Sequence, residues 1–497
     1  MAPPRLPLLL DAGWDGRRLT LRVAADAASL PERRLALDLD GTYFCDLPVD
    51  ARGVASVVFA FAPAGRSRLA VLPRQRRDGA ALLPAPLPLD LADAGDGALL
   101  PAPGTDAMAP QVAIVVPVYD APDEVARCLA SVLRHTTGRA RLIVIDDASP
   151  DPRIAPLLDR YAGLPGVEVL RNAANRGFTA TANRGIEAAG TADVVLLNAD
   201  TEVGPHWLTG LRRAVASSRD IASATAVSDN AGAFSVPELE CENALPAAWS
   251  FDDTARALWQ HAGLAYPMLP TGNGFCLYLR RAALDAVGMF DAEAFAQGYG
   301  EENDWCQRAA AAGWRHAIAG TVLVRHARSR SFGHARRIAL GVAGMAVLRA
   351  RWPRYEADVG ASLYSYERRV LDWRIRRLYA AATAANAPRP RRLRLDGSAD
   401  GDATVETWSL ASDAGGAQLR RVGEDGALGT IAAAGGPLER PLWDWLQRHA
   451  IESIAAGTAD AALTQIARDA AARLGIGWSE PGRIADNPRS FGDPPHD

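Results

Sequence analysis

The chain has 497 residues, a length at which two to four domains are expected rather than one core. Its formal net charge is −4, so no overall basic field indicates a nucleic-acid partner. Its 54 strongly basic residues are all arginine, which excludes a Schiff-base lysine and the lysine of a P-loop. The five cysteines are dispersed without a CxxC pair, which predicts reduced thiols in a cytoplasmic protein. We expect neither a signal peptide nor a membrane-spanning segment, because no apolar run approaches about 18 residues.

Residues 1–81 alternate between apolar and polar side chains. Leu19, Leu21 and Val23 share one face of an extended segment, and an Asp40-Gly41 turn separates two later runs. Alternation with period two, interrupted by turn signals, predicts a small β-sandwich. No chemical constellation is evident in this region, so we interpret it as an accessory or docking domain.

A segment rich in Pro, Ala and Gly, residues 82–110, predicts a linker. Residues 111–335 then alternate between apolar strands and amphipathic helices. The expected strands are 112–116, 142–145, 167–170 and 194–197, with helices beginning near Pro122, Phe178 and Trp207. This alternation predicts an α/β domain with a mostly parallel sheet flanked by helices. Ligands of such sheets bind beyond the carboxyl ends of the strands, so the chemistry should lie there.

The last third of the chain carries weaker patterns. Residues 336–386 predict an Arg-rich helical extension, either a solvated helix face or a surface that contacts anionic lipid headgroups. A second linker is expected at residues 387–392. Residues 387–497 as a whole predict a small α/β appendage with a disordered Pro-rich tail.

Acidic side chains follow three of the expected strands. Asp120 follows the first strand, Asp146 and Asp147 end the second, and Asp200 with Asn198 follows the fourth. Like charges gathered at one sheet edge repel one another unless a cation or hydrogen-bond donors offset them. A divalent metal bound through one carboxylate and a diphosphate would do so, because Mg²⁺ often keeps few protein ligands.

A second acidic cluster lies downstream, where glycines lead into a helix. Glu301, Glu302 and Asp304 stand in its first turn, denser than helix capping requires. A carboxylate held there is a candidate general base for an acceptor hydroxyl. His326 ends a later strand and is a candidate metal ligand.

Residues 111–335 resemble glycosyltransferase family 2, the inverting enzymes of the GT-A fold, and in particular its rhamnosyltransferase-like members. The matching motifs are Ile114–Tyr119, Asp146–Ser149, Asn175–Phe178 with Asn183, Asn198–Asp200, Gly272–Phe275 and Glu301–Glu302. Two positions depart from the family pattern. The first Asp of the DXD motif is Asn198, and the usual Asp of the Glu-Asp base motif is Glu302.

The resemblance implies roles for individual residues. The expected nucleotide-sugar-binding residues are Pro117, Tyr119, Asp146, Asp147, Asn175, Gly177, Asn183 and Asn198. The expected acceptor-side residues are Gly274, Glu301 and Trp305. Asp200 and His326 are the expected ligands of Mg²⁺ or Mn²⁺. The catalytic base is expected to be Glu302 by register, with Asp304 as the competing candidate.

The implied reaction is inverting transfer of a sugar from a dTDP- or UDP-sugar to a hydroxyl of a saccharide or lipid-linked saccharide. The resemblance places it in bacterial surface-glycan synthesis, in the cytoplasm or at the inner face of the membrane. Two alternatives stay open. A nucleotidyltransferase normally has a Gly-rich basic loop after its first strand, which Pro117–Asp120 does not provide. An inactive sugar-binding scaffold would not need the retained acids.

Overall fold

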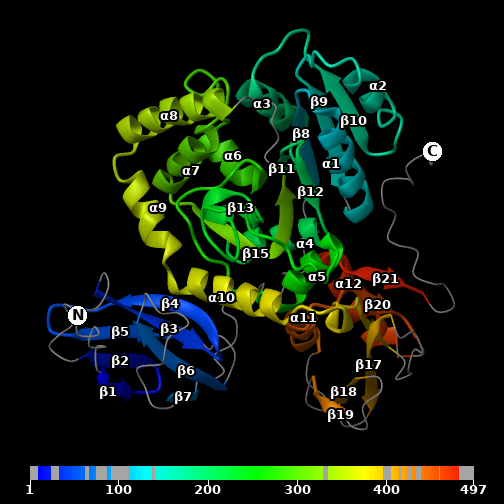
Figure 1. Cartoon of the computed structure of the whole chain (residues 1–497). Coiled ribbons are helices and arrows are strands. Elements are labelled where there is room, and N and C mark those ends of the chain that lie inside the picture. Colours follow the sequence, from blue (N-terminus) through cyan, green and yellow to red (C-terminus); the bar gives the residue numbers. More distant parts are fainter. Residues whose placement is uncertain are drawn as a thin grey trace. The chain divides into compact units, whose positions relative to one another are not determined.

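The computed structural model divides into two units, and each is described by itself (Figure 1). Unit 1 comprises residues 1–97 with 364–381, and unit 2 comprises residues 98–363 with 382–497. The structure describes residues 9–23, 33–61, 66–73, 87–90, 111–136, 140–327, 334–395, 404–413, 416–421, 427–431, 438–457, 459 and 461–480. Within these residues, no helix has the length and apolar composition needed to cross a membrane.

Unit 1 contains two antiparallel sheets, as the predicted sandwich requires. The three-stranded sheet has the order β1 (Leu9–Trp14), β2 (Arg18–Val23), β5 (Val54–Val58). The four-stranded sheet has the order β4 (Thr42–Pro48), β3 (Arg34–Leu39), β6 (Arg66–Pro73), β7 (Leu87–Asp90). Alternate side chains of β2 are buried, because one face of each sheet packs inward. The rings of Phe44 and Phe59 stack between the two sheets at 5.9 Å.

Two boundaries of unit 1 differ from the predicted ones. Strand β7 lies inside the predicted linker and pairs with β6, whereas residues 82–86 and 91–110 lie outside the described residues. Helix α10 (Tyr366–Ala381), predicted as part of the helical extension, groups with the β-sheets of unit 1. Its Trp373 packs against Phe44 and donates a 3.2 Å hydrogen bond to the Leu39 carbonyl. The aromatic residues of α10 therefore complete the apolar core of this unit.

Unit 2 is built on an eight-stranded mixed sheet. Its order is β10 (Val167–Arg171), β9 (Ala140–Asp146), β8 (Val112–Val118), β11 (Asp193–Leu197), β14 (Cys276–Leu279), β13 (Ile221–Val227), β15 (Arg315–His326), β12 (Thr201–Val203). The first four strands are parallel, as predicted. Strand β14 is antiparallel to both of its neighbours, and β12 is antiparallel to β15. The predicted α/β class is confirmed, with a larger antiparallel share than the sequence pattern indicated.

Helices cover this sheet, so that β8, β11 and β13 are buried along their whole lengths. The helices are α1 (Pro122–His135), α2 (Ile154–Asp159), α3 (Phe178–Ala188), α4 (Trp207–Ala216), α5 (Phe251–His261), α6 (Arg281–Val287), α7 (Glu301–Ala311), α8 (His334–Arg351) and α9 (Tyr355–Leu363). Helix α1 shows why they form where they do. Pro122 pre-sets its first turn, acids follow there, and Arg134 and His135 occupy its last turn, which suits the helix dipole.

The C-terminal part of unit 2 is a second α/β layer. Its sheet has the order β19 (Ala427–Thr430), β18 (Gly416–Arg421), β17 (Glu406–Asp413), β16 (Arg391–Arg394), β20 (Ser453–Ala455), β21 (Gly477–Ser479), with helices α11 (Glu439–Arg448) and α12 (Ala461–Leu474). Strand β16 begins inside the predicted second linker. The chain end, where the prediction places a disordered Pro-rich tail, lies outside the described residues from residue 481 onward. The Glu452 side chain, 7% exposed, joins this layer to the helices of the main domain, pairing with His206 before α4 at 2.8 Å and with Arg256 of α5 at 3.3 Å.

Candidate active site

Two predicted metal ligands meet at one end of the main sheet. Asp200 follows β11, and His326 is the last residue of β15. Strand β12 starts directly after Asp200 and pairs antiparallel with β15, with Thr201 opposite His326. This register brings the Asp200 Oδ1 and His326 Nε2 atoms to 3.4 Å. The two side chains are 16% and 13% exposed, so both lie at a partly open surface.

The imidazole of His326 is oriented by the backbone around it. Its Nδ1 lies 3.2 Å from the Asn230 carbonyl oxygen, and its main-chain N–H donates to Asp229 at 3.0 Å. Because a carbonyl only accepts, Nδ1 is the ring nitrogen that donates to it, and Nε2 is the nitrogen that faces Asp200. Phe275 stacks on the ring at 5.3 Å and fixes its plane. A carbonyl-oriented histidine beside a carboxylate is an arrangement found in metal sites.

These two residues fit a cation site that the protein completes only in part. In the described part of the chain, no group of three or more His, Cys, Asp or Glu side chains could hold a metal ion. Mg²⁺ is commonly bound by one or two protein ligands together with substrate phosphates and water. Neighbouring Asn198 has a buried Oδ1 that lacks a hydrogen-bond partner within the described residues. The oxygen and nitrogen donors therefore suit a cation that arrives with an anionic substrate.

The predicted base stands at the start of α7, after a loop with left-handed backbone. The φ angles of Gly298, Tyr299 and Gly300 are 86°, 69° and 144°, a run that only glycine adopts readily. Glu301 is 3% exposed, and one of its oxygens accepts from the Gly300 N–H at 3.1 Å. Glu302 is half-buried. Apart from the adjacent Glu301 carboxyl, its buried Oε2 has no partner in the described part of the chain.

Burial sets the protonation of this glutamate pair. It raises the pKa of Glu301 well above the ordinary value, and the charge of Glu302 raises it further. Burial also raises the pKa of Glu302, while nearby N–H groups, that of Gly274 among them, oppose the shift. Two adjacent buried carboxyls do not readily ionise together, so the pair retains one proton. We place that proton on Glu301, which leaves Glu302 as the carboxylate.

The Gly274-Phe275 segment contacts both the Asp200–His326 pair and the Glu301–Glu302 pair. The N–H of Gly274 favours the charged form of Glu302, and Phe275 stacks on His326. The Phe275 carbonyl also accepts from the Asn198 N–H at 2.9 Å, continuing the antiparallel pairing of β14 with β11. The metal-ligand candidates and the base candidate therefore flank one short stretch of backbone.

The structure corrects two predicted catalytic and acceptor-side residues. Asp304 is fully buried and accepts from Arg308 at 2.9 Å, and from Arg351 and Trp352 at 3.1 Å each. A carboxylate with these partners is an ion-pair centre, not an open base. Trp305 is also fully buried and donates to the Gly288 carbonyl at 2.8 Å, so its ring is not available to a sugar. The reason is helical geometry, because Asp304 lies about 200° around α7 from Glu302.

Predicted nucleotide-contacting residues instead hold loops in place. Asp147 Oδ1 accepts from Asn172 at 2.6 Å and from the Arg176 N–H at 2.8 Å, and Oδ2 accepts from the Gly177 N–H at 3.0 Å. The neighbouring Asp146 accepts from the Ser149 N–H at 2.9 Å. Both oxygens of Asp147 thus organise the loop of residues 172–177, which corrects its predicted role as a direct ligand contact.

The 175–178 motif and Asn183 face the segment that leads to α7. A Cβ on Gly177 would lie 2.2 Å from the Ala296 carbonyl oxygen, so only glycine fits there. The Asn183 amide donates to the Phe290 carbonyl at 2.8 Å and accepts from its N–H at 3.1 Å. Exposed Asn175 accepts from the Gly177 N–H at 3.1 Å. Gly177 and Asn183 therefore position the segment that leads to Glu302, a function that the sequence did not indicate.

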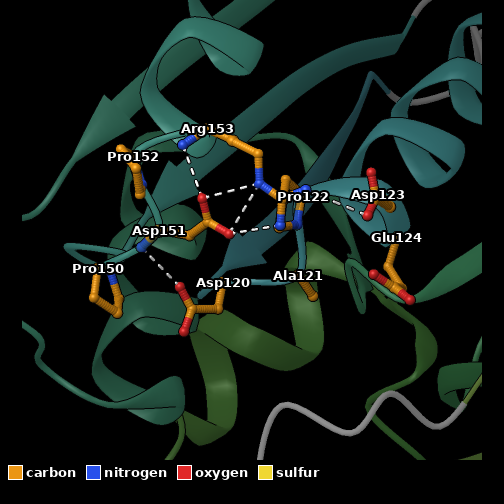
Figure 2. Close-up of a pocket in the computed structure, with 9 residues that line it drawn as sticks. All are labelled: Asp120, Ala121, Pro122, Asp123, Glu124, Pro150, Asp151, Pro152 and Arg153. Atoms are coloured by element: carbon orange, nitrogen blue, oxygen red, sulfur yellow. Dashed lines mark hydrogen bonds and ion pairs between the residues drawn. The ribbon is translucent and has the colours of Figure 1, made fainter.

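Two predicted contacts lie on β8 and directly after it. Pro117 is within the strand, opposite Ile145 of β9, and half-buried Tyr119 follows the strand end. Next to them, an open groove is lined by residues 120–124 and 150–153 (Figure 2). Figure 2 shows Arg153 between Asp151, at 2.8 Å, and Asp123, at 3.6 Å. Four acids against one arginine repel a diphosphate, so this groove does not suit the phosphates of a donor.

Sequence reasoning missed the residues that orient His326. Ser228, Asp229 and Asn230 directly follow β13, so they occupy a strand end like the other acidic turns. The rule that selected Asp200 would also have selected Asp229, had the carboxyl end of β13 been examined. Asp229 is bonded to the Ser228 hydroxyl and to the His326 N–H, and therefore acts through the histidine.

Comparison with known proteins follows the same part of the chain. Residues 113–266 match the model of the Glycosyl transferase family 2. This range includes the turns at Asp146 and Asp200 but ends before Glu302 and His326. The placement of those two residues beside the matched domain is therefore a finding of the structure.

The curated relatives that the chain matches are named as glycosyltransferases. Uncharacterized glycosyltransferase YibD of Escherichia coli strain K12 is 30% identical over 117 residues, 23% of this chain and 34% of that protein. The N-acetylglucosaminyl-diphospho-decaprenol L-rhamnosyltransferase of Mycobacterium tuberculosis is 28% identical over 242 residues, 44% of this chain and 77% of that protein. The chain spans about a third of the length of the first curated relatives that it matches.

Among solved structures, the mannosyltransferase PcManGT from Pyrobaculum calidifontis, in complex with GDP-Man and Mn²⁺, aligns with a TM-score of 0.37 and 18% identity. The alignment covers 56% of this chain and 76% of that one.

Proposed function

We propose that this chain is an inverting glycosyltransferase that uses a nucleotide-sugar donor and Glu302 as general base. The observation that carries the proposal is the state of the Glu302 carboxyl. Its Oε2 atom is buried without a protein donor in the described residues, Glu301 aside, and burial raises its pKa. A base works best when its pKa lies near the working pH, and a raised glutamate pKa moves toward that condition.

The chemistry is a single displacement. The acceptor oxygen forms a bond to the anomeric carbon while the bond from that carbon to the diphosphate oxygen breaks. The nucleoside diphosphate leaves with the bonding electrons, and the hydroxyl proton passes to Glu302. One displacement inverts the anomeric centre, and positioned base catalysis contributes about 10²–10⁴ in rate.

Asp200 and His326 would hold the divalent cation, Mg²⁺ or Mn²⁺, together with the donor diphosphate. Bound there, the cation would offset the negative charge of the departing diphosphate. The Asn230 carbonyl orients the His326 ring so that Nε2 faces the Asp200 carboxylate. Asp147 orders the loop of residues 172–177 at the donor side of the sheet edge.

The substrates are part of the proposal. The name of the rhamnosyltransferase relative describes transfer of rhamnose, a deoxysugar, to a lipid-linked saccharide. We propose the same class of acceptor here, with a dTDP-linked deoxysugar as donor and a UDP-sugar as the second donor candidate. We extend this to the synthesis of a bacterial surface glycan. Peripheral contact with a membrane would follow from such an acceptor.

A ligand panel tests the proposal. We expect UDP, dTDP or GDP to raise the melting temperature with Mn²⁺ and to have little effect with EDTA. A ligand at a hundredfold excess over its Kd stabilises the folded state by about 2.7 kcal/mol. The matching sugar donor should then release nucleoside diphosphate, and NMR of the transfer product should show the inverted anomer. If no nucleoside diphosphate binds and no donor is turned over, a catalytic role is excluded; retention of configuration would reject the single displacement.

A further inference from the structure

A small apolar core joins residues 295–300, the loop before Glu302 that we call the base loop, to the helices that follow the main sheet. It consists of Phe295, Leu348 and Tyr355, with Met345 and Trp352 among the residues packed against it. Phe295 belongs to the segment before α7, and the others belong to α8, α9 and their connection. These helices lie outside residues 113–266, the range of the family match. This core therefore ties the base loop to a later part of the chain.

The closest contact in this region is between two backbones. A Cβ placed on Gly344 in the middle of α8 would lie 1.8 Å from the Tyr299 carbonyl oxygen and 3.0 Å from its carbon. Only glycine lets the helix approach so closely, and the atom that it meets is main chain. Tyr299 is the non-glycine residue among the left-handed residues 298–300 of the base loop, two positions before Glu301. Helix α8 thus contacts the base loop at Tyr299, the residue whose backbone conformation is least usual for its type.

Arg351, the last residue of α8, connects both flanks of the same loop. Its Nη1 lies 2.9 Å from an Asp291 oxygen and 3.1 Å from an Asp304 oxygen. Trp352 Nε1 donates to the same Asp304 oxygen at 3.1 Å. Asp291 precedes the base loop and Asp304 stands one turn into α7. Charge-assisted bonds on both sides limit how far the first turn of α7 can move.

We infer that α8 holds the base loop in position, an arrangement that we call the clamp, and that Gly344 and Arg351 are positioning residues for Glu302. The inference rests on the proposed function, in which Glu302 takes the acceptor proton. Gly344 sets the distance between α8 and the Tyr299 peptide, and Arg351 holds the first turn of α7 in place. Together they keep the Glu302 carboxyl in its buried position beside Gly274.

Two glycines of the same helix make the matched test. Gly344→Ala places a methyl group against the Tyr299 carbonyl, whereas a Cβ at Gly341 meets nothing within 4 Å. Both changes exchange Gly for Ala inside α8, so their effects on helix propensity are alike. We expect Gly344→Ala to lower kcat at least tenfold with little change in the donor KM. The acid limb of the kcat–pH profile should move to lower pH as Glu302 loses burial. Gly341→Ala should behave as wild type.

A pair of arginines repeats the test without adding volume. Arg351→Met removes the bridge between Asp291 and Asp304, whereas Arg349→Met removes only an exposed pair with Glu356. We expect kcat to fall at least fivefold for the first variant and to be unchanged for the second. Equal activity of Gly344→Ala and Gly341→Ala, or a loss in donor KM alone, would overturn the clamp.

Hydrogen exchange separates this inference from the proposed function. Amides of residues 299–304 should exchange at least tenfold faster in Gly344→Ala than in Gly341→Ala, whether or not the wild-type protein turns over a donor. Unchanged exchange together with unchanged kcat would reject the clamp while leaving transferase activity intact. Faster exchange in a protein that releases no nucleoside diphosphate would reject the base assignment and keep the clamp.

Discussion

The two sides of the Gly274-Phe275 segment carry pairs of titratable side chains in different surroundings. On one side, which we call the open side, the Asp200 Oδ1 atom lies 3.4 Å from His326 Nε2 at a partly open surface. On the other side, which we call the covered side, the carboxyls of Glu301 and Glu302 are buried next to each other, and burial raises the pKa of both. The first pair offers a carboxylate with an imidazole nitrogen beside it. The second pair offers two carboxyls with one proton between them.

This difference separates two tasks that one acid cannot perform well. A cation with its diphosphate needs fixed lone pairs at a place that substrate reaches, and His326 receives its orientation from the Asn230 carbonyl and Phe275. A proton acceptor needs a pKa near the working pH, which burial of Glu302 promotes. Paired carboxyls whose surroundings differ are a common way to divide acid–base roles within one site. Each side can therefore be removed separately.

The largest expected effect comes from the covered side. Glu302→Gln keeps the shape of the side chain but removes its ability to take a proton, so kcat should fall about 10²–10⁴-fold. Binding of nucleoside diphosphate with Mn²⁺ should stay within twofold of wild type. Glu293→Gln, an exposed change in the segment before α7, is the control and should be silent. Steady-state kinetics and titration calorimetry check both, and wild-type turnover by Glu302→Gln would contradict the base assignment.

An intermediate effect is expected on the open side. His326→Ala removes the proposed imidazole ligand, and we expect Mn²⁺-dependent binding of nucleoside diphosphate to weaken at least about tenfold, or 1.4 kcal/mol. Binding in EDTA should not change. The chain supplies a matched control in His135, which lies 3.2 Å from Asp252 where α1 ends and α5 begins. If His135→Ala and His326→Ala weaken binding equally, the effect is general destabilisation and the metal assignment is wrong.

Features predictable from the sequence were those that depend on local pattern. Strand ends in a parallel sheet share one edge, so the positions of Asp147 and Asp200 followed from alternating strands and helices. The register that brings His326 to Asp200 depends on the short strand β12, which no periodicity revealed. The N-terminal sheets were visible as period-two alternation, whereas the packing of α10 against Phe44 of the same unit was not.

Roles within the site were harder to predict because they depend on what packs against each side chain. Glu302 and Asp304 are two residues apart and equally acidic, yet only Asp304 meets Arg351 and Trp352. Asp147 fits a ligand-binding motif, but its oxygens are taken by the loop of residues 172–177. A sequence motif identifies a carboxylate, and only the fold decides whether its partners are protein donors or a substrate.

The smallest expected effect concerns stability and tests the covered pair without any substrate. Glu301 has a folded-state pKa above its unfolded value, so the folded protein holds the extra proton. Its stabilising contribution is complete below the unfolded pKa, about 4.3, and is lost as pH rises through the folded pKa. Glu301→Gln cannot lose that proton. Relative to wild type, its melting temperature should therefore rise progressively above pH 5, by about 1 °C for each kcal/mol of stability difference, because the unfolding entropy grows with the size of the unit. Calorimetric scans from pH 4.5 to 8.5 measure the difference. Parallel curves for the two proteins would mean that Glu301 is already ionised at neutral pH. The proton that we assign to the pair would then be absent, and Glu302 would lose the neighbour that keeps it the single charged carboxylate of the covered side.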